Sequence, residues 1–180
     1  FLARNEVFEV DHPLTLKDKT TRLEKIGSLA KNNPKYVAVD FSKDDLSEKL
    51  RESGFDEAVL SFFSWLGVTY YLTESEIKST LSSLSELCRS GSEIVFDYPD
   101  ENFPSCAVPR VKRTLMMAAA GGEPMKSFLS AARVEEILSE CGFAVKEHLF
   151  PADVQARIIG DKGTNMTAFE CVNYIRAIKL

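Results

Sequence analysis

The sequence predicts an α/β fold built on an open, mostly parallel sheet with helices on both faces. Strand-like and helix-like segments alternate four times along the 180 residues, the order expected when each strand returns to one sheet through a helix. The segment at 56–65 is continuously apolar, which is typical of strands buried on both faces. Two strands joined by a loop come last, and they indicate an antiparallel hairpin at one edge of the sheet.

An acid closes each of the first two predicted strands. The run "VFEVD" is rich in strand-forming residues and ends on Asp11, and Pro13 then stands where a helix accepts proline in its first turn. The next strand repeats the arrangement, since "VAVDF" carries Asp40 near its end. The other elements predicted in this part of the chain are helices at 13–31 and 42–55.

The best-marked helix is predicted at 73–91. Thr73 and Glu76 have the spacing of a capping box, and the apolar residues that follow recur at helical intervals. The segment 99–124 holds four prolines and two adjacent glycines, so we expect an insertion or lid there, with a loop and a short helix. The remaining predictions are strands at 92–98, 143–150 and 165–180 and a helix at 132–143, all in a single domain spanning 1–180.

Composition excludes several classes of partner. The net charge of −5 argues against nucleic acid, whose phosphates favour basic surfaces, and the three charges of "VPRVKR" at 108–113 predict only a solvated loop. No apolar run reaches the roughly 20 residues of a membrane helix. The four cysteines form no C-x-x-C pair and the two histidines are far apart, so we expect no metal site and a reducing, cytoplasmic location.

Carboxylates at the ends of parallel strands suit nucleoside binding. Ligands of open parallel sheets bind beyond the carboxyl ends of the strands, where Asp11 can accept hydrogen bonds from both hydroxyls of a ribose. Asp40 can accept from an adenine amino group while the Phe41 backbone N–H donates to the ring. The alternatives are equally simple: Asp11 caps the next helix or supports the turn, and Asp40 is an acid favoured at a helix N-terminus.

Four segments, in this order and spacing, resemble a known family. "VFEVDHP", "VAVDF", "FFSWLGVTYYLT" and "IVFDY" are similar to segments of the S-adenosylmethionine-dependent methyltransferases of the leucine carboxyl methyltransferase type, in their bacterial branch. The resemblance runs from about Val7 to the last residue. It implies a Rossmann-like class I methyltransferase sheet, mostly parallel with a C-terminal antiparallel strand.

The resemblance also implies the cofactor, S-adenosylmethionine, and its contacts. Asp11 matches the family's acid for the ribose, and Asp40 with Phe41 matches the pair that holds adenine. The segment Phe63–Ser64–Trp65 matches the stretch that lines the cofactor and the incoming substrate, although core or lid packing would equally explain Trp65 and the tyrosines after it. Where some relatives carry Glu, this chain has Leu66.

The family's first strand, with its glycine-rich loop, and a basic N-terminal helical segment belong upstream of the printed residues. The expected fold is therefore the C-terminal portion of the domain, with the first strand missing from the sequence as it begins at Phe1.

The expected reaction is methyl transfer to a carboxylate or hydroxyl, on a small molecule or a protein C-terminus. A carboxylate needs no general base. For a hydroxyl the sequence offers Asp97, Tyr98 and His148 without singling one out, so the catalytic residues stay unknown, as does the oligomeric state. The alternatives are a nicotinamide-dependent oxidoreductase on a similar fold, or a non-catalytic remnant of a methyltransferase.

Overall fold

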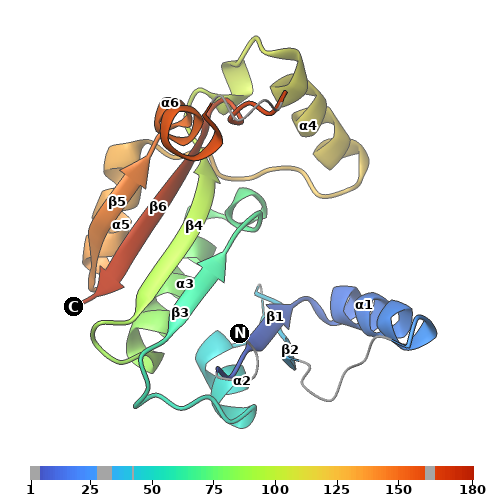
Figure 1. Cartoon of the computed structure of the whole chain (residues 1–180), viewed down its shortest axis with the longest axis vertical. Helices are drawn as coiled ribbons and strands as arrows, with labels where there is room; N and C mark the ends of the chain where they lie inside the picture. The colour runs from blue at the N-terminus through green and yellow to red at the C-terminus, as the bar shows by residue number, and fades with distance from the viewer. Residues whose placement is uncertain (1–4, 28–33, 42, 161–164) are drawn as a thin grey trace. The chain divides into compact units, whose positions relative to one another are not determined.

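Two sheets form, one in each of the two units into which the chain divides, residues 1–57 and 58–180 (Figure 1). The computed structural model describes residues 5–27, 34–41, 43–160 and 165–180. The two units are treated in turn.

In the first unit two short parallel strands carry the predicted acids at one edge. Strand β1 (Phe8–Asp11) pairs in parallel with β2 (Lys35–Ala38), and the Val39 N–H extends the pairing by donating to the Asp11 carbonyl at 3.0 Å. Strand β2 ends two residues before Asp40, so the prediction that Asp40 lies within the strand is wrong. The acid instead follows the strand at its carboxyl end.

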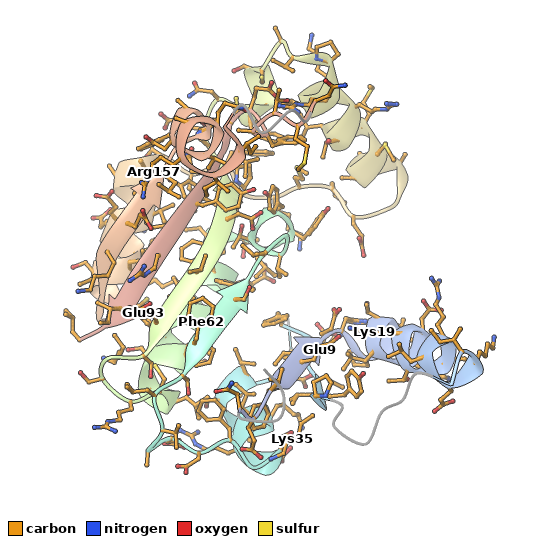
Figure 2. All side chains as sticks on the ribbon, viewed as in Figure 1. Glu9, Lys19, Lys35, Phe62, Glu93 and Arg157 are labelled. Carbon is orange, nitrogen blue, oxygen red and sulfur yellow. The ribbon has the colours of Figure 1, made fainter. Side chains whose placement is uncertain are left out.

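The two helices of the first unit are shorter than predicted. Helix α1 (Pro13–Lys25) begins at the predicted proline, with His12 as its N-cap, and α2 (Leu46–Glu52) begins after the N-cap Asp45. The end of the predicted 13–31 helix falls partly outside the described residues. A surface ion pair between Glu9 of β1 and Lys19 of α1 joins strand to helix (Figure 2).

The second unit contains a four-stranded sheet in the order β3-β4-β6-β5. Strand β3 (Phe62–Trp65) is parallel to β4 (Glu93–Pro99), whereas β6 (Val172–Lys179) is antiparallel both to β4 and to β5 (Phe143–Leu149). Three strands therefore share one direction and the last strand of the chain runs against them. This confirms the predicted sheet and refines it, because β6 lies inside the sheet and β5 forms the edge.

Helices α3 (Glu74–Leu87) and α5 (Ala131–Glu140) cover one face of this sheet, as Figure 1 shows. Leu81 of α3 and Ile137 of α5 meet Phe96 and Tyr98 of β4, and all four side chains are almost fully buried. Side chains at alternate positions, such as Phe62, lie on the opposite face. Figure 2 shows Phe62 on β3. The residue is 64% exposed, so the predicted burial of both faces of β3 is wrong.

Three segments differ from their predictions for identifiable reasons. Strand β6 begins at Val172, because Cys171 has a positive φ of 58° that interrupts extended backbone. The connection before it is partly helical, with α6 (Pro151–Asp153) and a π-helical segment, η3 (Val154–Ile159). The basic segment "VPRVKR" is the start of helix α4 (Pro109–Ala120) and not a solvated loop.

The predicted capping box at the start of α3 is confirmed. The Glu76 N–H donates to Thr73 Oγ1 at 3.3 Å, and the Thr73 N–H donates to Glu76 Oε2 at 2.6 Å. The bond from the Thr73 N–H and a second one from Thr73 Oγ1 to the same carboxylate oxygen, at 2.8 Å, lower the pKa of the Glu76 carboxyl. The stabilisation is therefore present at neutral pH and is lost as the pH falls below the ordinary carboxyl range.

Replacing Thr73 with Ala should lower the free energy of unfolding by about 1 kcal/mol, since it leaves a helix-end N–H without its acceptor. Urea unfolding followed by circular dichroism measures this change. Ser79→Ala, at an exposed position within the same helix, is the matched control and should change stability by less than about 0.5 kcal/mol. Equal effects of the two substitutions would contradict the capping role.

Candidate functional site

In the first unit the two predicted acids lie at the same edge of the parallel strand pair. Asp11 is the last residue of β1, and its Oδ1 accepts a hydrogen bond from the His12 N–H at 2.7 Å. The Asp40 carboxylate lies 2.5 Å from Lys43 Nζ and 4.0 Å from His12 Nε2. Asp11 thus stands at the carboxyl end of β1 and Asp40 just beyond that of β2, where the sequence predicts a nucleoside.

The structure tests the alternative roles that the sequence allows for these acids, which are helix capping or turn support for Asp11 and a place at a helix N-terminus for Asp40. The N-cap of α1 is His12, whose Nδ1 accepts from the Leu14 N–H, so Asp11 does not cap that helix, although its carboxylate does support the turn. Asp40 lies well before α2, whose N-cap is Asp45. Asp40 is therefore not an acid of the first helical turn.

The segment Phe63–Ser64–Trp65 lies in β3 of the second unit, and its side chains alternate between the two faces. Phe63 and Trp65 are on the helix-covered face, where the Trp65 ring packs against Phe96 at 5.7 Å between centroids. Ser64 is on the opposite, exposed face. The core-packing alternative therefore accounts for the Trp65 ring.

One atom of Trp65 is not explained by packing. Trp65 is 8% exposed, yet its Nε1 is buried without a hydrogen-bond partner among the described residues. A buried unpaired donor costs about 1–3 kcal/mol. An acceptor atom of a bound molecule would satisfy it, and this fits a predicted contact segment.

A buried carboxylate organises the turn that follows β3. Asp97 of β4 is 7% exposed. Its Oδ1 accepts from the Gly67 N–H at 2.7 Å, its Oδ2 accepts from the Tyr70 hydroxyl at 2.8 Å, and its carbonyl accepts from Thr69 Oγ1 at 2.6 Å. Burial and the Asp97 charge raise the pKa of Tyr70, so this phenol stays protonated at neutral pH.

Beside this turn lies a cavity of about 260 Å³. Five aromatic side chains line it together with Met125, and these rings come from the turn after β3, the 3₁₀ turn η2 (Phe103–Ser105), the segment leading into β6 and β6 itself. These aromatic residues are Tyr70, Tyr71, Phe103, Phe169 and Tyr174. All of the lining belongs to the second unit.

One arginine of the insertion fixes a wall of the cavity. Arg110 of α4 donates to Thr167 Oγ1 at 2.8 Å and to the carbonyl of Ala168, and it pairs with Glu170, whose pKa it lowers. Its guanidinium also lies 5.1 Å from the centre of the Phe169 ring. The residues before β6 are therefore held against α4 and not in the sheet.

The three candidate bases named from the sequence differ in position. Tyr98 is 1% exposed, and burial raises its pKa to about 12. Its hydroxyl lies 2.7 Å from His148 Nε2, and His148 Nδ1 lies 2.9 Å from Glu135. Tyr98 and His148 thus form a polar chain that runs from the core to the exposed Glu135. Asp97 alone of the three is linked, through Tyr70, to the cavity.

Sequence reasoning missed most of the cavity. Phe103, Met125 and Phe169 lie in segments without regular periodicity, and no spacing joins them. The one available signal was the aromatic pair Tyr70–Tyr71 directly after a strand. Among the described residues no cluster of His, Cys, Asp and Glu could hold a metal ion, and none of the described helices has the length and apolar character needed to cross a bilayer.

Comparisons with known proteins identify relatives. The family model described as leucine carboxyl methyltransferase matches residues 1–85. The Bacillus subtilis protein YktD, whose name places it with the S-adenosyl-L-methionine-dependent methyltransferases, is 38% identical over 176 residues, 97% of this chain and 58% of its own length. A similarly named Mycobacterium avium protein is 34% identical over 99 residues, 54% of this chain and 33% of its own.

Solved structures show the same fold at low identity. A duf574 family protein from Streptomyces avermitilis superposes with a TM-score of 0.66 at 19% identity, covering 97% of this chain and 65% of its own. Magnesium protoporphyrin IX methyltransferase from Synechocystis, with bound SAH, gives a TM-score of 0.56 at 13% identity. The match covers 99% of this chain and 65% of the methyltransferase.

These likenesses agree with the resemblance that the sequence predicts, and they bear out its α/β Rossmann-like class I methyltransferase fold. The chain spans less than two thirds of the length of these curated relatives. It is similar to the bacterial S-adenosylmethionine-dependent methyltransferases of the leucine carboxyl methyltransferase family.

Proposed function

We propose that the protein carrying this chain transfers a methyl group from S-adenosylmethionine to a carboxylate or hydroxyl oxygen. Residues 1–180 form one methyltransferase domain in this proposal, with 99–124 as its insertion or lid. The cofactor supplies an electrophilic methyl group on a sulfonium. The protein's task is to bind this donor and to align the acceptor, because such a displacement depends mainly on positioning.

One observation carries the proposal from this chain's own residues: Asp11 lies at the carboxyl end of β1 and Asp40 just beyond that of β2, at the same edge of this parallel pair. A carboxylate that only accepts hydrogen bonds suits a ribose diol, and a second suits the adenine amino group. Asp11 therefore binds the ribose, and Asp40 with Phe41 binds adenine. Phe63, Ser64 and Trp65 are the proposed contacts of the second unit, with the unpaired Trp65 Nε1 as a donor to the bound molecule.

Replacing Asp11 with Ala should raise the dissociation constant for S-adenosylmethionine about 100-fold or more. The physical reason is the loss of hydrogen bonds from two hydroxyls to a charged acceptor, each worth about 1.5–3 kcal/mol. Isothermal titration calorimetry of the full-length protein measures this constant.

Asp18→Ala is the matched control, since Asp18 is an exposed acid on α1 whose ion-pair partner is Arg22. It should bind the cofactor within twofold of wild type. Absence of binding heat in wild type, or equal affinity of the Asp11 variant, would refute the cofactor assignment. A parallel titration with NAD tests the oxidoreductase alternative, and tight NAD binding would favour it.

The role of Asp40 can be separated from general destabilisation by changing the ligand as well as the protein. Wild type should bind S-inosylhomocysteine about tenfold more weakly than S-adenosylhomocysteine, because the adenine amino donor to Asp40 is absent. In Asp40→Ala the two ligands should bind equally. A preference for adenine that survives in the variant would show that another group reads the base.

A further inference from the structure

We propose that the aromatic cavity receives the methyl acceptor, and that this acceptor is a small planar aromatic molecule whose hydroxyl group donates to the Tyr70 oxygen. This inference rests on the proposed methyltransferase function and adds the class of substrate. It also gives Tyr70 and Asp97 a part in moving the acceptor's proton.

The lining of the cavity selects flat, apolar ligands. Five of its nine residues are aromatic, and aromatic rings prefer to pack on other rings in offset or edge-to-face arrangements. The stacked pair Phe103 and Phe169, with centroids 6.2 Å apart and planes 15° from parallel, already sets the orientation of one wall. At about 260 Å³ the cavity is near the lower end of ligand-binding pockets.

The charge of the lining disfavours an anionic group at this place. Its nine residues include no Lys, Arg or His, so a carboxylate or phosphate here would lose water without gaining a cation. Arg110, whose guanidinium lies against the Phe169 ring, already pairs with Glu170. It also donates to Thr167 Oγ1 and to the Ala168 carbonyl, so it is not available to a ligand anion. A neutral hydroxyl meets no such penalty.

Tyr70 further distinguishes a hydroxyl from other polar groups. Its own proton is directed to Asp97 Oδ2 at 2.8 Å, so its oxygen can offer only lone pairs to a ligand. The partner must therefore be a donor. An aromatic hydroxyl meets this need and is also an oxygen that can take a methyl group.

The same pair accounts for the proton released in the reaction. As the acceptor oxygen bonds to the methyl carbon, the carbon–sulfur bond breaks and its electron pair stays on sulfur. The hydroxyl proton passes to Tyr70 Oη while the Tyr70 proton passes to Asp97 Oδ2. Asp97 becomes neutral and later releases the proton to solvent, which restores the starting state.

Binding of 2-naphthol to the full-length protein tests the proposal without depending on activity. We expect wild type to bind 2-naphthol about five- to tenfold more tightly than 2-fluoronaphthalene, which has a similar shape but no donor. Tyr70→Phe should remove this difference. Tyr71→Phe, which deletes a second hydroxyl from the same lining, should preserve it. Quenching of the naphthol fluorescence and competition measure the affinities.

Because each protein is compared with itself across two ligands, a loss of stability in Tyr70→Phe does not produce the expected pattern. Thermal unfolding confirms that each variant is folded at the assay temperature. The proposal is overturned if wild type binds neither ligand, as when another segment of the protein fills the cavity, or if 2-naphthoate binds better than 2-naphthol. It is also overturned if Tyr70→Phe keeps the preference for the hydroxyl.

Failure of this inference is distinguishable from failure of the proposed function. If S-adenosylmethionine binds and depends on Asp11 while 2-naphthol does not bind, the acceptor class is wrong and the methyltransferase stands. If 2-naphthol binds through Tyr70 and the cofactor does not bind, the cavity holds an aromatic hydroxyl for another purpose and the methyl-acceptor assignment falls.

Discussion

The candidate acceptor site depends on the hydrogen bonds that the buried carboxylate of Asp97 accepts. This carboxylate accepts hydrogen bonds from Gly67 and Tyr70, and so it ties the turn after β3 to the end of β4. Removing one partner from such a group leaves a buried charge without its hydrogen bond. The free-energy cost of this is larger than the net stabilisation that the bond itself provides. The position of Tyr70 at the cavity is therefore fixed by a side chain of the neighbouring strand.

The order of strands gives this carboxylate its place. Parallel pairing of β3 with β4 brings both carboxyl ends to the same edge, and antiparallel insertion of β6 delivers Tyr174 beside Asp97 in the register. The first unit repeats the principle with Asp11 and Asp40. In both units, polar side chains near the carboxyl ends of parallel strands lie at the same edge because the strands share a direction.

Much of this fold could be predicted from local patterns, and the failures have physical causes. The capping box of Thr73 and the proline start of α1 depend on neighbouring residues alone, and both are present. The predicted strand at 165–180 failed because a distant residue, Arg110, binds its first part and Cys171 turns the backbone. The burial predicted around Phe62 failed because periodicity reports apolar character and not which face a helix covers.

In the candidate site, too, features that depend on neighbouring residues could be predicted, whereas features that depend on distant residues could not. Asp11 and Asp40 could be proposed from the sequence because acids at strand ends have a recognisable context and the family resemblance gives them roles. The cavity could not, since Phe103, Met125 and Phe169 meet only after the insertion has folded against the residues preceding β6. Tyr98 and His148 show the converse, because polar residues near a strand end can belong to the core.

Arg110 binds residues 167–170 outside the hydrogen-bonded strands. The shape of the cavity wall and the structure of the sheet can therefore change independently of each other. Insertions and substitutions in α4 can reshape the wall around Phe169 while the hydrogen-bonded strands of the sheet remain as they are. In the proposed function, what the protein recognises can therefore diverge while the sheet is kept. Families that keep one donor and diversify their acceptors would gain from such a division of labour.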